Sequence, residues 1–509
     1  MSNPNPPALV APPPRWLLAL SFLALFGYAL FLARHTTTVA GGADSSGYLN
    51  SARLLAAGEL HTTLRTPPEF GGPGQVDRLH FFPQGFFPFA SDLKLSPTYP
   101  TGLPLHLALT GKLFGWHAGP LIVGLTGALA ALGLCYAVAR ELALAPVLSA
   151  AAAVILGACP VFIFTSTQPL SDTLATAWSL AAVYAALRAR RQTPWALACG
   201  AALSVAVLVR PSNLLLLPAL LVFLGLDWRR LALMLPGGLP GAAWFAFSNH
   251  TLFGGAFRSG YPDLASAFAA SYGPSTALHF AHWLAIFLPS ILLVLPLAAV
   301  FRSAAPRRDR LALGLWFGAL TLLYVFYAIS HESWSCLRFL LPALPALIFS
   351  ALLGLEALLR LTPAPHIPTL RAVAAGLLVV WSLVASHHWT RQLGVLYIQG
   401  YEQVYEDANL AAKSQLPPDA LVVASFLSGA LYFYTDFSVL RWDHLNSTDF
   451  SRYATLAQKS GRPICAVLHE SEEPAALRER CLGHWTRLAT VKSVGLWRLT
   501  PATPAPAAK

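Results

Sequence analysis

The sequence predicts a mainly α-helical bundle that crosses a membrane many times, with additional helices in an external loop and a small C-terminal α/β domain. Of the 509 residues, 55% are hydrophobic and only 11% are charged, whereas soluble globular chains carry roughly 25% charged residues. The apolar stretches run for about 16 to 23 residues, the length of a helix that crosses a hydrocarbon core. Short alternating segments, as in a transmembrane barrel, are absent from the sequence. We therefore expect an integral membrane protein.

The apolar stretches predict about eleven spanning helices. Prolines at their edges, such as Pro146, Pro194 and Pro211, suit helix starts. The first stretch is too long and too apolar for a cleaved signal, so we interpret it as a retained helix, preceded by a disordered proline-rich segment. The predicted spans are 16–34, 118–139, 146–164, 169–187, 194–209, 212–226, 231–249, 278–300, 311–329, 337–359 and 370–389.

The arginines predict the orientation of the bundle. Every second connection is short and rich in arginine, and such connections face the cytoplasm. The N-terminus is then inside, and the external segments are 35–117, 250–277, 330–336 and the tail from 391. The net charge of +11 follows from this pattern, so nucleic acid is not an expected partner. The basic connections contain Arg140, 188–191, 227–230, 301–310 and 360–371.

We expect residues 1–390 to form one transmembrane module, which includes the loop 35–117. Residues 391–500 have a different composition. The stretches "ALVVASF", "PICAVLHE" and "SVGLWRL" predict strands and "EEPAALRERCLGHW" predicts a helix, which together indicate a small external α/β domain. Residues 501–509 are expected to be disordered. A disulfide between Cys465 and Cys481 is possible in an oxidising compartment.

Two features stand out in the external loop 35–117. Tyr48, Ala52 and Leu55 share one face at helical spacing, which suits a helix lying on the membrane surface. The stretch "LHFFPQGFFPF" at 79–89 is aromatic and broken by prolines. It fits either a loop that contacts lipid or part of an aromatic belt.

Several polar residues lie at the predicted outer ends of helices. Asp44 and Asp172 stand where helices begin, so each can be an N-cap, and a cap still leaves one carboxylate oxygen for chemistry. Arg210 and Arg338 can extend to lipid headgroups. Outer loops are usually poor in arginine, however, so these two arginines, and Lys94 as a point charge, also suit an anionic ligand such as a lipid phosphate.

A metal site is a further alternative at one of these outer loops. His331 and Glu332 are adjacent and can bind a metal if a third ligand joins them, or they can form a solvated loop. No motif with metal-ligand spacing accompanies them.

Five motifs in order resemble those of the GT-C glycosyltransferases, which include protein mannosyltransferases and lipid A aminoarabinose transferases. An aspartate that follows the first helix, a Tyr-Pro loop, a second acidic segment and two later Arg-containing segments resemble that family over about residues 16–360. The motifs are "GGADSSGYLNSARLLAAG", "KLSPTYPTGLPLHLAL", "QPLSDTLATAWSLAAVYAALRAR", "VLVRPSNLLLLPAL" and "CLRFLLPALPAL".

The resemblance implies an enzyme that transfers a sugar from a polyprenyl-phosphate donor to an acceptor hydroxyl at the outer membrane boundary, usually with inversion. Asp44 is then expected to be the general base, and Asp172 to stabilise positive charge on the sugar. The resemblance implies no cofactor and does not require a metal. The residues expected to bind substrate or phosphate are Lys94, Tyr99, Arg210, Arg338 and Glu332.

The acceptor stays open: it can be a protein, a lipid or a glycan. The expected location is the cytoplasmic membrane of a bacterium, with the site on the periplasmic side. Two other functions are compatible with the sequence. One is a transporter or flippase for an anionic lipid-linked solute, although the predicted spans have almost no ionisable residues at their centres and Glu356 lies near one end. The other is a scaffold that acts through its external tail.

Overall fold

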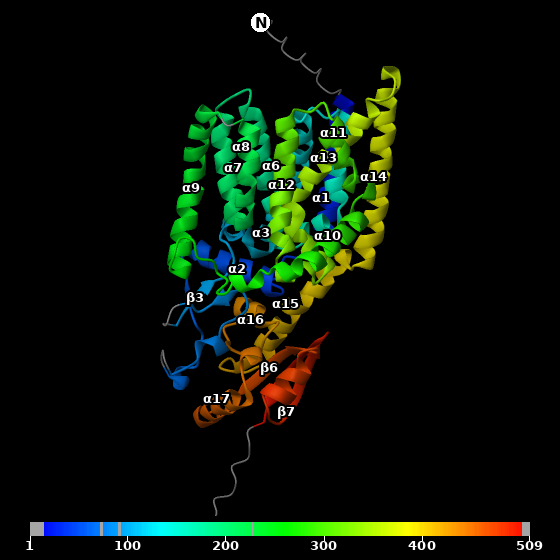
Figure 1. Cartoon of the computed structure of the whole chain (residues 1–509). Helices are drawn as coiled ribbons and strands as arrows, with labels where there is room; N and C mark the ends of the chain where they lie inside the picture. The colour runs from blue at the N-terminus through cyan, green and yellow to red at the C-terminus, as the bar shows by residue number, and fades with distance from the viewer. Residues whose placement is uncertain (1–14, 72–74, 90–92, 226, 501–509) are drawn as a thin grey trace, which may run out of the picture.

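The computed structural model describes residues 15–71, 75–89, 93–225 and 227–500, with side chains from Phe22 onward. The segments expected to be disordered, before Arg15 and at 501–509, lie outside this description. A bundle of long helices forms one part of the molecule and a C-terminal sheet forms the other, with the external loop between them (Figure 1).

Ten of the eleven predicted spans coincide with a helix or with two consecutive helical segments, and the span 278–300 coincides with three, α10, η6 (Ser290–Leu293) and α11. The prolines act as expected: Pro146 and Pro211 are the first residues of helical segments, and Pro194 directly precedes one. The helices of the bundle are α1 (Arg15–His35), α3 (Gly102–Glu141), α4 (Pro146–Ala158), α5 (Pro160–Ser166), α6 (Ser171–Ala189), α7 (Trp195–Val209), α8 (Leu217–Leu224), α9 (Trp228–Phe253), α10 (Gly273–Phe287), α11 (Leu295–Arg302), α12 (Arg307–Val325), α13 (Leu344–Leu359) and α14 (Ile367–Gln392).

Not every helix of the bundle is a full span by itself. Within the described ranges, four helical stretches are long and apolar enough to cross a membrane, and a fifth is added if α4 and α5, which meet at 64°, form one broken span. Helix α3 is also interrupted, because Gly115 has a φ of 84°, a conformation that suits glycine. The positions of the helices are therefore confirmed, while the number of spans stays a prediction.

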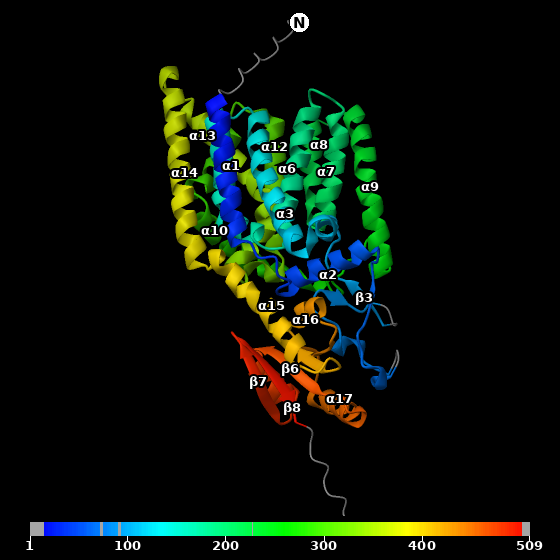
Figure 2. The same cartoon turned by 180° about the vertical axis from the view of Figure 1, so that it is seen from behind.

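The basic connections gather at the end of the bundle far from the C-terminal sheet. There, Glu141 at the end of α3 contacts both Arg188 and Arg191 at 3.3 Å. Arg190 at the end of α6 pairs with Asp309 at the start of α12. The loop 35–117 and the tail lie at the opposite end, as both views show (Figures 1 and 2). The alternation predicted for the loops is thus present, and which end faces the cytoplasm stays a prediction.

The external loop forms a layer beneath the bundle. Its main helix, α2 (Ala43–Ala57), packs against α3 and against α16 (Ser428–Tyr434) of the tail. The predicted face of this helix is turned inward: Tyr48 and Ala52 are buried and Leu55 is partly buried. The loop also contains a small sheet in the order β1-β3-β2 and two short 3-10 turns. These elements are β1 (Thr62–Thr63), η1 (Pro68–Phe70), η2 (Arg78–His80), β2 (Phe86–Phe87) and β3 (Lys94–Pro97).

The tail contains a five-stranded mixed sheet in the order β5-β4-β6-β8-β7. The three predicted strands coincide with β4, β6 and β8, and the predicted helix is cut to a short π-helical stretch because the chain from Trp485 joins the sheet. The elements are α15 (Ile398–Gln415), β4 (Leu421–Ala424), α16, β5 (Ser438–Arg441), α17 (Ser447–Ser460), β6 (Ile464–His469), η12 (Pro474–Arg480), β7 (Trp485–Val491) and β8 (Val494–Leu499).

The two tail cysteines form no disulfide in the structure. Both are free and buried, and they belong to separate hydrophobic clusters. Cys465 packs with residues of α15, such as Ala408, whereas Cys481 packs with residues of α17, such as Tyr453. A sheet separates the two side chains, so the suggested bridge is wrong.

The aromatic stretch 79–89 contacts the tail rather than lipid. Phe81 lies 5.2 Å from the ring of Tyr453, Phe82 lies 5.0 Å from the ring of His444, and Phe86 lies 5.1 Å from the ring of Tyr432. All three phenylalanines are buried in a cluster that they share with the C-terminal sheet. Both interpretations of this stretch as a membrane contact are therefore wrong: the external loop and the tail share one core.

Candidate active site

Asp44 lies in the first turn of α2, directly below the bundle. It is not an N-cap, because Gly42 occupies that position and no side chain caps the helix. Instead, Asp44 Oδ1 accepts a hydrogen bond from the Tyr99 hydroxyl and Oδ2 accepts one from Arg338 Nη2, both at 2.7 Å. A carboxylate in the first turn of a helix also interacts favourably with the helix dipole.

Asp172 occupies the equivalent place in α6. Leu170 is the residue before the helix, so Asp172 is not a cap either. Its side chain is only 2% exposed and forms an ion pair with Arg210. A buried charge is tolerated when it is paired and hydrogen-bonded, so Arg210 is a fixed counter-ion here and does not extend to lipid headgroups.

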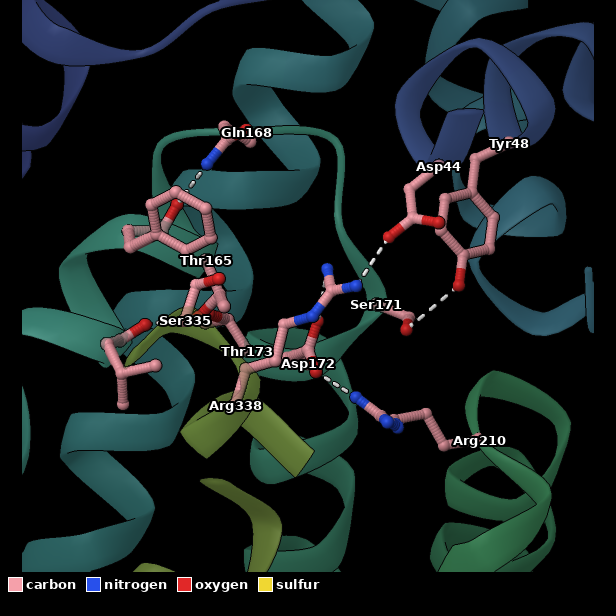
Figure 3. A network of polar contacts seen from close by, with 12 residues as sticks. Asp44, Tyr48, Thr165, Gln168, Ser171, Asp172, Thr173, Arg210, Ser335 and Arg338 are labelled. Carbon is pink, nitrogen blue, oxygen red and sulfur yellow. Dashed lines mark hydrogen bonds and ion pairs between the residues drawn. The ribbon is translucent and has the colours of Figure 1, made fainter. Parts of the chain in front are cut away.

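Arg338 connects the two aspartates. Its Nη2 atom donates to Asp44, and its Nη1 atom lies 3.9 Å from Asp172 Oδ2. Figure 3 shows the guanidinium of Arg338 between the two carboxylates, with Arg210, the residue that follows α7, approaching Asp172 from another side. The structure thus brings together four predicted site residues from four segments, in a cluster of two carboxylates and two guanidiniums.

Both arginines are positioned by proline-containing 3-10 segments that continue into helices. Arg210 has an extended backbone and precedes η3 (Pro211–Leu216), which leads into α8. Arg338 lies inside η8 (Trp334–Ala343), which leads into α13. Runs of 3-10 helix of this length are uncommon and often mark functional positions.

Two tyrosines complete the cluster. The Tyr48 hydroxyl donates to Ser171 Oγ at 3.0 Å, and its ring lies 4.7 Å from the ring of Tyr99. Gly47 makes room for Tyr99, because a Cβ atom there would lie 2.3 Å from the ring. Burial and the nearby charge of Asp44 raise the pKa of Tyr48 to about 12 and raise the pKa of Tyr99 as well. Both hydroxyls therefore stay protonated and serve as donors.

The surroundings keep Asp44 ionised. Burial by itself would raise the pKa of this carboxyl, but the charge of Arg338 and the hydrogen bonds from Tyr99 and Arg338 outweigh it, so the pKa lies below its ordinary value. The Asp44 side chain is 31% exposed, in contrast to 2% for Asp172. Asp44 is therefore a stable carboxylate that a ligand can reach.

Two of the predicted binding residues lie outside this cluster. Lys94 is exposed and opens β3, opposite Thr63. The strand from Lys94 to Pro97 is roughly 10 Å long. It separates Lys94 from Tyr99, which belongs to the cluster. Glu332 is exposed in the connection between α12 and η8. The neighbouring His331 hydrogen-bonds Thr276 at 3.1 Å.

Among the described residues, no third ligand joins His331 and Glu332 to form the metal site suggested as an alternative. In the part of the chain that the structure describes, no group of three or more His, Cys, Asp or Glu side chains is placed to hold a metal ion.

Glu402 is a residue of this region that the sequence did not reveal. It belongs to α15 of the tail, and its carboxylate packs directly against Gly41, where a Cβ atom would overlap it. Among the described residues it has no hydrogen-bond or ion-pair partner. Burial, followed by the charge of Asp44, raises the pKa of Glu402 to about 7. The sequence did not predict this contact, because Glu402 belongs to a segment that was expected to form a separate domain.

A small cavity of about 10 Å³ lies beside the cluster, between α3, α5 and α6. Leu103, Thr165, Gln168 and Thr173 are among its lining residues. Its volume corresponds to roughly one water molecule, so it does not by itself provide room for a substrate.

A family model for dolichyl-phosphate-mannose-protein mannosyltransferases matches residues 100–253, the segment that contains Asp172 and Arg210. No curated protein matches the chain in a sequence comparison.

Several solved structures share the fold. ArnT from Cupriavidus metallidurans bound to undecaprenyl phosphate is 18% identical, with a TM-score of 0.55, and the match covers 95% of this chain and 98% of that chain. AglB, an oligosaccharyltransferase from Archaeoglobus fulgidus in complex with an inhibitory peptide and a dolichol-phosphate, is 12% identical, with a TM-score of 0.57 and coverage of 97% and 75%. The arabinofuranosyltransferase AftD from Mycobacteria is 15% identical, with a TM-score of 0.55 and coverage of 96% and 42%. The resemblance to the GT-C glycosyltransferases is confirmed, and the fold is theirs.

Proposed function

We propose that this protein is an integral-membrane glycosyltransferase that transfers a sugar from a polyprenyl-phosphate donor to an acceptor hydroxyl at the external membrane face, with inversion. The observation that carries the proposal is the cluster of Asp44, Asp172, Arg210 and Arg338. These four residues come from segments far apart in the sequence and meet at the boundary between the bundle and the external layer. A carboxylate and two guanidiniums at a membrane boundary suit a reaction in which a lipid phosphate leaves.

Asp44 is the proposed proton acceptor. The acceptor oxygen forms a bond to the anomeric carbon, the bond from that carbon to the phosphate oxygen breaks, and the acceptor proton passes to Asp44. Asp44 suits this role because it is ionised and 31% exposed. Each of its oxygens already accepts one hydrogen bond, and each retains a lone pair for the acceptor hydroxyl.

Arg210 and Arg338 are proposed to stabilise the polyprenyl phosphate, which gains a negative charge as it leaves with the bonding electron pair. A guanidinium has five N–H donors and can bind phosphate through two of them. The contacts of Asp172 favour a positioning role over a direct contact with the sugar, because its buried side chain is engaged by both arginines. Lys94, Tyr99 and Glu332 remain proposed binding residues, with Tyr99 already held against Asp44.

The first prediction tests this assignment with purified full-length protein and a panel of radiolabelled polyprenyl-phosphate sugars. We expect one donor to release or transfer its label, and Asp44→Asn to lower the rate by roughly 100-fold to 10,000-fold, the contribution of a general base. Asp263→Asn is the matched control, since Asp263 is an exposed aspartate in a segment also predicted to be external. Near-normal turnover by Asp44→Asn would exclude Asp44 as the base, and no release from any donor would contradict the proposed reaction.

A further inference from the structure

A second, larger cavity lies in the external layer, between α2 and the tail. Its volume is about 350 Å³ and it is open to solvent on one side. Four separate segments form its wall: the later turns of α2, the loop around β1, helix α15, and the end of α16 with the residues that follow it. The lining residues used below are Asn50, Arg53, Thr62, Arg65 and Lys413.

Two arginines in this wall are held in place by stacking. The guanidinium of Arg53 lies 3.3 Å from the ring centroid of Phe433, and its Nη1 donates to the Phe433 carbonyl at 2.6 Å. The guanidinium of Arg65 lies 3.8 Å from the ring centroid of Tyr432, and its Nη1 donates to the Thr435 carbonyl at 2.7 Å. The guanidinium of Arg53 also lies 5.7 Å from the ring centroid of Trp116. Stacking covers the faces of the guanidiniums and leaves most of the donors along their edges for a ligand.

The charge of the wall is strongly positive. Lys413 adds a third cation and is exposed. The carboxylate among the lining residues, Asp436, is 95% exposed and lies 3.7 Å from Arg65. An ion pair with so exposed a partner is weak, so Asp436 does not neutralise the cavity. Thr62 and Asn50 add polar groups that can hydrogen-bond a ligand, and two fixed guanidiniums suit a planar or tetrahedral oxyanion.

We propose that this cavity binds an oxyanion, a phosphate or a carboxylate, carried by the acceptor glycan. Helix α2 links the cavity to the cluster described above, because Asp44 is in its first turn and Arg53 comes nine residues later, about 14 Å along the helix axis. An acceptor anchored in the cavity is therefore longer than a single sugar residue. The identity of the bound molecule as the acceptor rests on the proposed function, whereas oxyanion binding by the cavity does not.

The test measures binding to the full-length protein in detergent, by titration calorimetry. The probes are glucose 6-phosphate and glucuronate, with glucose as the neutral control, all at constant ionic strength. We expect both acidic sugars to bind and glucose not to bind. The double variant Arg53→Gln/Arg65→Gln should lose about tenfold or more in affinity for both acidic sugars.

Two further variants separate a lost site from a misfolded protein. Lys413→Gln changes an exposed residue, so the fold is retained, and we expect a smaller loss of affinity, about threefold to tenfold. Arg487→Gln is the matched control, because Arg487 also stacks on an aromatic ring, Trp497 at 4.3 Å, but lies on the tail sheet away from the cavity. It should leave binding unchanged.

Binding of a polyprenyl phosphate is measured on the same variants. We expect it to be unchanged by the cavity substitutions. Absence of this binding in every protein would contradict the proposed function while leaving the oxyanion site in place. The cavity proposal is overturned if neither acidic sugar binds, or if the variants bind them as the unmodified protein does. The protein is also tested for binding to vesicles of phosphatidylcholine, with and without phosphatidic acid. Binding only to the vesicles that contain phosphatidic acid, together with no binding of the soluble sugars, would assign the cavity to a lipid headgroup. That result would also overturn the cavity proposal.

Discussion

The two ends of the helical bundle use the same chemistry in different ways. Both contain arginines paired with carboxylates that are largely buried. At the end next to the tail, Arg338 and Arg210 hold Asp44 and Asp172. At the far end, Arg371 and Arg360 hold Glu356, and Arg190 holds Asp309.

The difference lies in which segments the pairs connect. The pairs at the far end connect residues at or near the ends of helices, such as the end of α13 with the beginning of α14 and the end of α6 with the beginning of α12. The cluster near the tail instead joins two helices of the bundle, a 3-10 segment and the external helix α2. It also contains tyrosine donors and leaves Asp44 within reach of a ligand. The ion pairs at the far end only join helix ends, whereas this cluster is also the proposed site of binding and reaction.

The largest expected effect in this comparison comes from Arg338→Gln set against Arg371→Gln. The two side chains are similarly exposed, 22% and 25%, and each donates to a carboxylate at 2.7 Å. We expect Arg338→Gln to lower sugar transfer by roughly 100-fold or more, because the proposed donor to the leaving phosphate is lost. Arg371→Gln should leave the transfer rate within about twofold and lower the stability by about 1–3 kcal/mol.

Transfer rates and thermal unfolding of both proteins, measured in the same detergent, check this contrast. Equal losses of activity in the two variants, after correction for the folded fraction, would mean that the cluster near the tail has no special role in the reaction.

The helices were predictable from the sequence because the length of an apolar stretch is a local property of the chain. It also indicated Asp44, Asp172, Arg210 and Arg338, since charged residues are rare at helix ends predicted to be external, and the resemblance to the family placed them together. The prediction that the two aspartates cap helices was wrong, and so was the prediction that the two arginines extend to lipid headgroups. Each of these side chains instead pairs with a residue more than thirty positions away in the sequence.

Contacts between the external loop and the tail were not predictable in the same way. Phe81, Phe82 and Phe86 have the composition of a membrane contact, and only the fold shows that Tyr453, His444 and Tyr432 cover them. The loop and the tail were expected to belong to different domains, so no local pattern related Glu402 to Gly41. Local periodicity predicts where helices and strands lie in the sequence. It does not predict which distant segments pack against them.

Glu402 provides a second, smaller contrast between the two ends. Each acid of the far-end pairs has an arginine partner, whereas Glu402 has no partner among the described residues. Its pKa is raised from 4.5 to about 7. The folded protein therefore holds a proton that the unfolded chain releases between about pH 4.5 and pH 7, so stability falls as the pH rises through this range. The upper limit of the effect is about 3 to 4 kcal/mol, since one pKa unit corresponds to about 1.4 kcal/mol.

Glu402→Gln removes this titration, so we expect the melting temperature to become less dependent on pH in that range, relative to the unmodified protein. Glu406→Gln is the control, one turn further along α15. Thermal unfolding at a series of pH values checks the prediction. An unchanged slope in Glu402→Gln would show that other groups cause the pH dependence.

The smallest expected effect comes from Arg360→Gln at the far end. Arg360 contacts Glu356 at 3.1 Å from four residues away, and its side chain is 51% exposed. Pairs of this kind on a helix contribute about 0.3–0.5 kcal/mol, because water screens the charges and the side chain loses freedom. Arg371, which is half as exposed and donates two hydrogen bonds to the same carboxylate, remains in place. We therefore expect a change in unfolding free energy below about 0.5 kcal/mol and no change in transfer. A loss as large as that of Arg371→Gln would mean that Glu356 requires both arginines, and that the far end is a coupled network rather than a set of separate pairs.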